Sequence, residues 1–99
     1  MTQPIEIDVP GFGKLAARRP VHGEFDAGLV IRLAGLLSTE NPRAAAALCR
    51  TVAETLRAVA PGAGDLIARL EAGDAGLALE TADGLAEAID LCAGFRGEL

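Results

Sequence analysis

The sequence predicts a mainly α-helical fold: a small bundle of about four helices preceded by an N-terminal extended arm or β-hairpin. In residues 26–95, apolar residues recur every three or four positions, which is typical of helices that bury one face. Residues 1–25 lack this period and contain an alternating apolar and acidic run that ends in a Pro/Gly turn. With 99 residues, the chain is expected to form a single domain over 1–99.

The arm is predicted to be a β-hairpin. Ile5–Val9 alternates between apolar and acidic side chains, the period of a strand with one buried face. Pro10–Gly13 has the composition of a turn, and Lys14–Arg18 can return as a second strand, although its alternation is weaker. Because an isolated hairpin is marginal in water, we expect this one to lie on the helices or on a second subunit.

The first helix follows the arm directly. Asp26 is a plausible N-cap, and the stripe behind it is the richest apolar stripe in the chain. We therefore expect this helix to anchor the core. Its stripe consists of Leu29, Val30, Leu33, Leu36 and Leu37.

The second helix has the clearest start signal. Asn41 can cap it and Pro42 suits its first position, after which residues 43–60 contain no helix breaker. On its polar face, Glu54 lies four residues from Arg50 and three from Arg57. This spacing predicts a solvated ladder of ion pairs.

The remaining helices are less well marked. Asp65 is expected to cap a short third helix, and the last helix is expected to run from about Asp74 to Cys92 or Ala93. Gly76 and Gly84 either weaken the last helix or mark a close contact between helices.

The composition favours a homodimer. Much of the apolar content is alanine, and the chain has three Phe but no Trp or Tyr. Small side chains bury little area, so the core is thin for a domain of this size, and oligomerisation is a common remedy. Cys49 and Cys92 lie in apolar helical patterns and are expected to be buried, reduced thiols.

Charge and hydropathy exclude several classes of partner. Residues 1–64 carry seven basic and six acidic side chains, whereas residues 65–99 carry two basic and eight acidic ones. This distribution argues against nucleic-acid backbones and anionic lipid. The sequence contains neither a membrane-spanning apolar run nor the pattern of a signal peptide, so we expect a cytoplasmic protein.

No standard catalytic or cofactor motif is present. One His and two distant Cys do not make a metal site, and the Gly-containing turns lack the longer pattern of phosphate-binding loops. Ser38, the only serine, lacks the context of a nucleophile. We therefore expect no metal and no cofactor, and we assign no catalytic residue.

The arm instead concentrates side chains suited to recognition. It holds two of the three Phe, the only Lys, the only His and an Arg-Arg pair. A ligand is therefore expected to contact this segment. The predicted substrate-binding residues are Phe12, Arg18, Arg19, His22, Glu24 and Phe25.

Each of these residues also has a purely structural interpretation. Phe12, at the turn, either anchors a ligand or folds back onto the first helix or a second subunit. The Arg-Arg pair either grips a ligand carboxylate or makes salt bridges across the hairpin to Glu6 or Asp8.

His22 has three interpretations. It lies in a loop and can carry a proton at neutral pH, with Glu24 near enough in sequence to orient it. A contact with substrate without proton transfer is the second interpretation, and a surface histidine of no consequence is the third.

The arm IEIDVPGFGKLAARRPVHGEFD ahead of short helices, in a protein of this size, resembles the lysinoalanine-forming proteins of duramycin- and cinnamycin-type lanthipeptide pathways. The resemblance covers size, layout and the lack of a standard catalytic constellation, and it includes no diagnostic motif. It implies a homodimer that binds a thioether-bridged peptide and promotes addition of a peptide lysine to dehydroalanine. In such proteins the substrate's own carboxylate serves as base, and the protein contributes orientation.

Two other functions remain open. One is a non-enzymatic dimeric adaptor or chaperone that binds peptides or proteins by strand addition. The other is an accessory protein that binds a small molecule between its helices.

Overall fold

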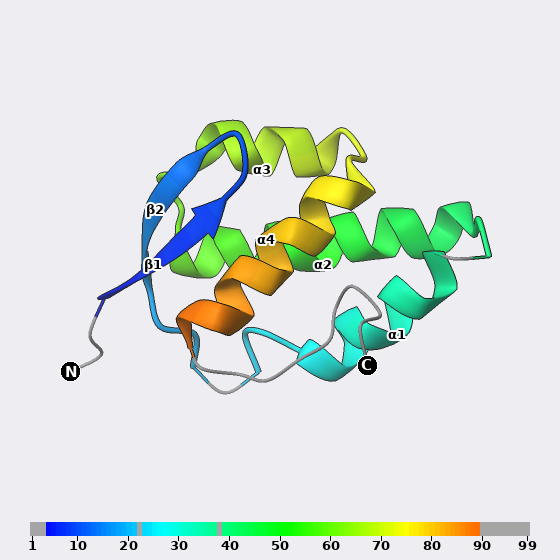
Figure 1. Ribbon diagram of the computed structural model, residues 1–99, viewed down its shortest axis with the longest axis horizontal. Helices are drawn as coiled ribbons and strands as arrows, with labels where there is room; N and C mark the ends of the chain where they lie inside the picture. Colours follow the sequence, from blue (N-terminus) through cyan, green and yellow to red (C-terminus); the bar gives the residue numbers. More distant parts are fainter. Residues whose placement is uncertain (1–3, 22, 38, 90–99) are drawn as a thin grey trace.

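The computed structural model describes residues 4–21, 23–37 and 39–89 and confirms a hairpin followed by four helices (Figure 1). The elements are β1 (Pro4–Val9), β2 (Gly13–Arg18), α1 (Ala27–Leu37), α2 (Pro42–Val59), α3 (Gly64–Glu71) and α4 (Ala75–Ala88). None of the helices in this part of the chain has the length and apolar character needed to cross a bilayer.

The hairpin has the predicted strands and turn. β1 and β2 pair antiparallel, with Ile7 opposite Leu15 and Val9 opposite Gly13. The amide of Phe12 donates to the carbonyl of Val9 at 3.0 Å, and Gly11 has a φ of 87°. This is the geometry of a type II turn, which Pro10 and Gly11 favour at its two central positions.

The hairpin lies on helix α4 rather than on α1. Ile7 and Val9 of β1 are fully buried, as the alternation predicts, and β1 packs along α4 (Figure 1). A Cβ atom at Gly84 would lie 2.6 Å from the carbonyl oxygen of Asp8, so only glycine allows this approach. The expected close contact at Gly84 is therefore between helix and strand, not between two helices.

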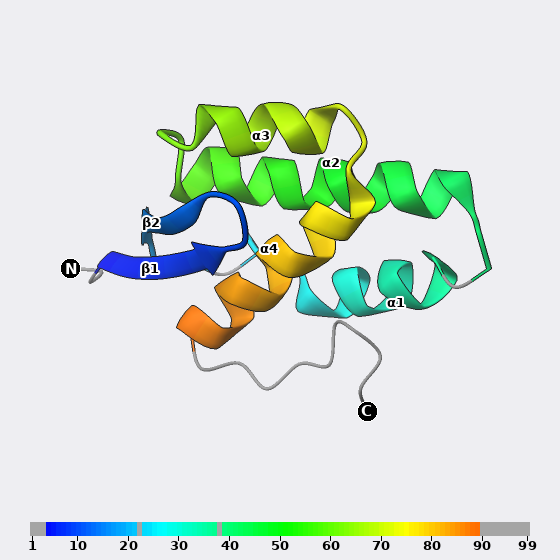
Figure 2. The ribbon, with the colours of Figure 1, turned by 45° about the horizontal axis from the view of Figure 1, so that its top comes forward.

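Helix α2 is the centre of the bundle and packs against α1, α3 and α4 (Figure 2). Its buried face includes Leu48, Val52 and Leu56, at helical spacing. Helix α1, expected to anchor the core, has only Val30 and Leu33 among the buried residues. Leu36 of the predicted stripe is 44% exposed.

Two of the three predicted caps are confirmed, because Asp26 and Asn41 accept backbone N–H groups at the starts of α1 and α2. Asp74, predicted only as the approximate start of the last helix, accepts the amide of Leu77 and caps α4. The cap predicted for α3 is wrong, because Ala63 occupies that position without a side-chain hydrogen bond. Asp65 lies inside the first turn of α3.

The polar face of α2 also differs from the prediction. Arg57 pairs with Glu71 of α3 instead of Glu54, so the expected ladder along α2 is wrong. The neighbouring helix offers a carboxylate that sequence spacing cannot reveal.

The C-terminal predictions can be compared only in part. Helix α4 ends at Ala88, with Ile89 as its C-cap, whereas the predicted ends, Cys92 and Ala93, lie outside the described residues. Cys49 is a buried free thiol, as expected, and burial raises its pKa.

Candidate functional site: a groove along β2

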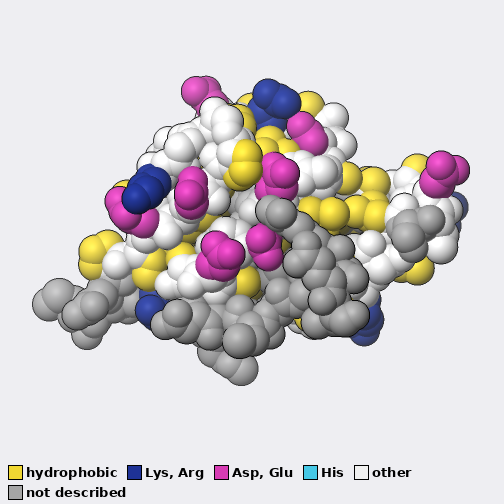
Figure 3. Space-filling view, in the orientation of Figure 1, with side chains coloured by type: hydrophobic (Ala, Val, Ile, Leu, Met, Phe, Trp, Pro, Cys, Tyr) yellow, Lys and Arg dark blue, Asp and Glu magenta, His cyan; other side chains and the backbone are white. Residues whose placement is uncertain are grey.

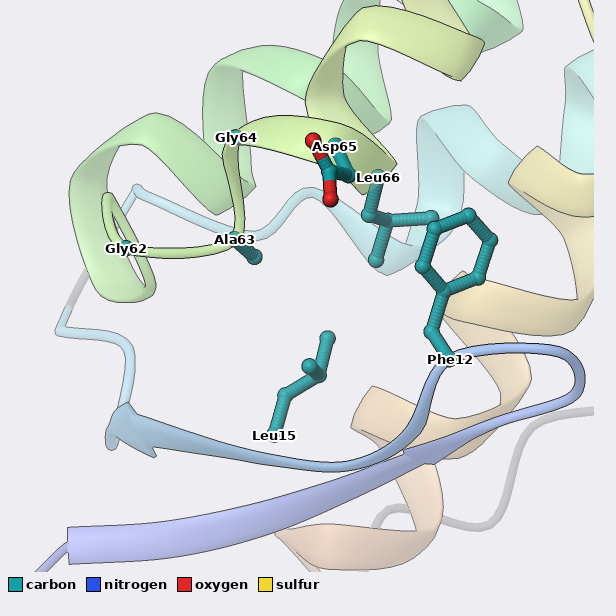
Figure 4. A pocket seen from close by; sticks show the side chains of 7 residues that line it. All are labelled: Phe12, Leu15, Gly62, Ala63, Gly64, Asp65 and Leu66. Atoms are coloured by element: carbon teal, nitrogen blue, oxygen red, sulfur yellow. The ribbon is translucent and has the colours of Figure 1, made fainter.

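Two open hollows lie between β2 and the connection from α2 to α3, and together we call them the groove. Its first half is a hollow of about 360 Å³ in which Phe12 and Leu15 of the hairpin face Ala63 and Leu66 across the gap (Figure 4). Gly62, Gly64 and Asp65 complete the lining. The walls are therefore mainly apolar, with one carboxylate among them.

The second half of the groove continues toward the C-terminal end of β2. It is a hollow of about 310 Å³, and Gly62 lines both halves. Its walls are small or apolar except for one arginine. They are Pro4, Ala16, Ala17, Arg18, Val59, Ala60, Pro61 and Gly62.

The groove follows from local sequence on both sides. Pro61 and Gly62 separate α2 from α3, because proline and glycine suit a turn between two helices. Opposite them, β2 carries alanine at two successive positions and presents little side-chain bulk. In the part of the chain that the structure describes, β2 pairs only with β1, which leaves its other edge without a strand partner.

Arg18 is held by Glu24 at the end of the groove. Its two terminal nitrogens donate to the two carboxylate oxygens of Glu24, both at 2.6 Å. One of them also donates to the carbonyl of Ala58, near the end of α2, at 3.0 Å. This arrangement, which we call the Arg18–Glu24 clasp, connects the hairpin to the bundle.

The clasp corrects the expected pairing of the arginine. The hairpin register places Arg18 opposite Pro4, and its partner is Glu24 rather than Glu6 or Asp8. The bidentate pairing occupies the Arg18 fork that would otherwise be available to a ligand carboxylate.

Glu24 is likewise committed to the fold. Its hydrogen bonds from Arg18, and then from the amide of Val21 at 2.8 Å, lower the pKa of its carboxyl to about 2. Its backbone carbonyl accepts a hydrogen bond from the hydroxyl of Thr55 at 2.8 Å. Its carboxylate is thus directed to Arg18 and Val21, and His22 lies outside the described residues.

The other predicted residues are dispersed. Arg19 is exposed and does not line the groove, and Phe25 is half-buried against the core. Phe12 is half-buried beside Leu66 of α3, not on α1 (Figure 4). It also borders a further hollow of about 440 Å³ between the turn and the start of α4.

The far wall of the groove was missed at the sequence level. Residues 60–66 carry no motif, and Pro61–Gly64 has only the composition of a helix end and a turn. Leu15 is the detectable signal, since it has the largest apolar side chain of β2 and lies opposite Ile7 in the hairpin.

The chemistry of the groove is that of a binding surface. Its charged lining residues are Asp65 in one half and Arg18 in the other. Among the described residues, no group of three His, Cys, Asp or Glu side chains is placed to hold a metal ion.

No protein-family model, curated protein or solved structure matches this chain. The groove itself therefore carries the functional inference.

Proposed function

We propose that the protein binds a peptide in extended conformation along the free edge of β2. The observation that carries the proposal is the groove, which runs beside this edge and is apolar over most of its length. An unpaired strand edge offers backbone donors and acceptors to an added strand.

The two edges of the hairpin are not equivalent. Helix α4 approaches β1 so closely that the carbonyl of Asp8 lies against Gly84. Beside β2, by contrast, the hollows have volumes within the lower range for ligand sites. An added peptide would therefore take the β2 side.

Alternate side chains of such a peptide would face the groove. Successive residues of a strand point to opposite sides, so every second residue can enter an apolar hollow. The hollow between Phe12, Leu15 and Leu66 suits one bulky apolar side chain. The somewhat smaller hollow beside Ala16 and Ala17 suits a smaller side chain.

The resemblance to lysinoalanine-forming proteins suggests a thioether-bridged peptide as the first substrate to test. In that reaction, the lysine Nζ of the peptide bonds to Cβ of a dehydroalanine, and a proton passes from the amine to Cα. The protein would contribute orientation, with the substrate's own carboxylate as base and no cofactor. Among the described residues that line the two hollows, the charged side chains are Asp65 and Arg18.

A blocked groove tests the binding proposal. Gly62 lines both hollows, and an added Cβ there has no atom within 4 Å, so Gly62→Leu adds bulk at the groove without a clash at Cβ. Gly35→Leu, on α1, places the same side chain in equally open space away from the groove and is the matched control.

The probes are an array of octapeptides and a dehydrated, thioether-bridged precursor peptide. We expect the wild-type protein and Gly35→Leu to bind the same peptides, and Gly62→Leu to lose at least tenfold in affinity. Equal binding by Gly62→Leu, or no binding by any probe to the wild-type protein, would overturn the proposal. Mass spectrometry of the precursor peptide reports separately on cross-link formation.

A further inference from the structure

We infer that the peptide carries a basic residue two positions from the bulky apolar residue that enters the groove, because these two side chains of a strand point to the same side. This inference rests on the proposed function and names the class of peptide. Its basis is Asp65, the one charged side chain that lines the hollow between Phe12, Leu15 and Leu66.

Asp65 is available to a ligand. It is exposed, it forms no ion pair with another described residue, and its carboxylate points into the hollow (Figure 4). A lysine or arginine two positions from the inserted apolar residue lies on the same side of the strand and would reach this carboxylate at the rim. The apolar stem of either residue could lie along the wall formed by Leu15.

The nearby basic residues are mostly matched by acids already. Arg18 pairs with Glu24, Arg69 pairs with Asp74, and the hairpin register places Lys14 opposite Asp8. Arg19 is exposed and does not line either half of the groove. The charge presented beside the apolar hollow is therefore negative.

The wider surface has the same sign. Acidic side chains gather over the hairpin and α4 in Figure 3. Glu6 and Asp8 of β1 are exposed. The net charge of the chain is −5. A basic peptide would thus be attracted before contact, whereas an acidic peptide would be repelled.

The position of Asp65 also argues against an acidic ligand group. The start of a helix ordinarily favours an anion, and α3 has no side-chain cap. Asp65 supplies negative charge in that first turn, so a ligand carboxylate placed there would meet a like charge.

Three matched peptides test the inference: acetyl-Gly-Phe-Val-Lys-Val-Gly-amide and its counterparts with Gln or Glu in place of Lys. Calorimetry with the wild-type protein should give the Lys peptide an affinity about two- to fivefold above that of the Gln peptide, the range of an exposed ion pair. The Glu peptide should bind more weakly than the Gln peptide.

Substitutions of Asp65 test whether this residue causes the order of affinities. With Asp65→Asn, the Lys and Gln peptides should bind equally, and with Asp65→Lys the Glu peptide should bind best. Glu40→Gln, at the far end of the molecule between α1 and α2, removes one negative charge and should leave the wild-type order unchanged.

The outcomes separate the two proposals. Equal affinities of all three peptides for the wild-type protein, with loss of binding in Gly62→Leu, would overturn the basic-residue inference and leave groove binding intact. An unchanged preference in Asp65→Asn would also overturn the inference, because the selectivity would then come from elsewhere. Equal affinities that Gly62→Leu does not reduce would overturn both.

Discussion

Gly84 is the residue at which the hairpin and the bundle come closest. Its Cα lies against the backbone of β1, where a methyl group would meet the carbonyl oxygen of Asp8 at 2.6 Å. Backbone atoms cannot move aside as a flexible side chain would. Because Gly84 has no side chain, the hairpin can approach α4 this closely, and one wall of the groove is positioned with it.

A pair of glycine substitutions tests this placement. Gly84→Ala should lower the free energy of unfolding by about 1–3 kcal/mol, because the overpacked contact outweighs the higher helix propensity of alanine. Gly35→Ala, at an exposed position in the last turn of α1 with open space around it, should raise this free energy by about 0.5–1 kcal/mol. The midpoints of urea denaturation should therefore shift in opposite directions for the two variants. A shift of both midpoints in the same direction would contradict this account.

The Arg18–Glu24 clasp predicts a pH dependence. The pKa of Glu24 lies at about 2 in the folded protein, below its ordinary 4.5. A carboxyl with a lowered pKa stabilises the fold above the ordinary value, and this contribution is lost as the pH falls from about 4.5 toward 2.

Denaturation midpoints of the wild-type protein and Glu24→Gln, measured from pH 7 to pH 2, isolate this contribution. The wild-type protein should be more stable than the variant at neutral pH, and the difference should shrink below about pH 4.5. A constant difference across that range would show that the ion pair does not stabilise the fold.

At the scale of the elements, helix α2 is the framework and its start depends on Asn41. The side chain of Asn41 accepts hydrogen bonds from the amides of Arg43 and Ala44 at 3.0 and 3.2 Å. Asn41→Ala should therefore lower the free energy of unfolding by about 1 kcal/mol. Asn41→Ser keeps an acceptor and should recover most of the loss in the same denaturation experiment.

The elements themselves could be predicted from the sequence because each has a local cause. The alternation of Ile5–Val9 marks β1, and Asn41 with Pro42 marks the start of α2. The cap of α3 could not be predicted from the sequence. Asp65 is of a residue type that is preferred at N-caps, but the N-cap of α3 is Ala63, two positions earlier. The choice of partner was also hidden, since Arg57 selects Glu71 across helices rather than Glu54 on its own helix.

The site was less predictable than the fold for a related reason. Arg18 and Glu24 have the residue types of a ligand site, but tertiary structure brings them to each other. The groove instead takes one wall from residues 60–66, which lie more than forty positions from Leu15 in the sequence. No local pattern links two segments that meet only after α2 and α3 have packed.

At the scale of the whole molecule, the predicted homodimer remains a proposal. Two of the large apolar residues exposed in the described part of the chain, Ile31 and Leu36, lie on α1. Such a surface is suited to contact with another chain. If α1 forms the dimer contact, sedimentation equilibrium should find a dimer that Leu36→Glu converts to monomer, and a monomeric wild-type protein would contradict it.

The central claim is that a peptide pairs with the free edge of β2. Hydrogen exchange of backbone amides, measured with and without a bound octapeptide, tests it most directly, because a third strand would protect the β2 amides that point away from β1. We predict slower exchange at alternate residues of Gly13–Arg18, with little change in α1. Unchanged exchange throughout β2 at saturating peptide would contradict the account.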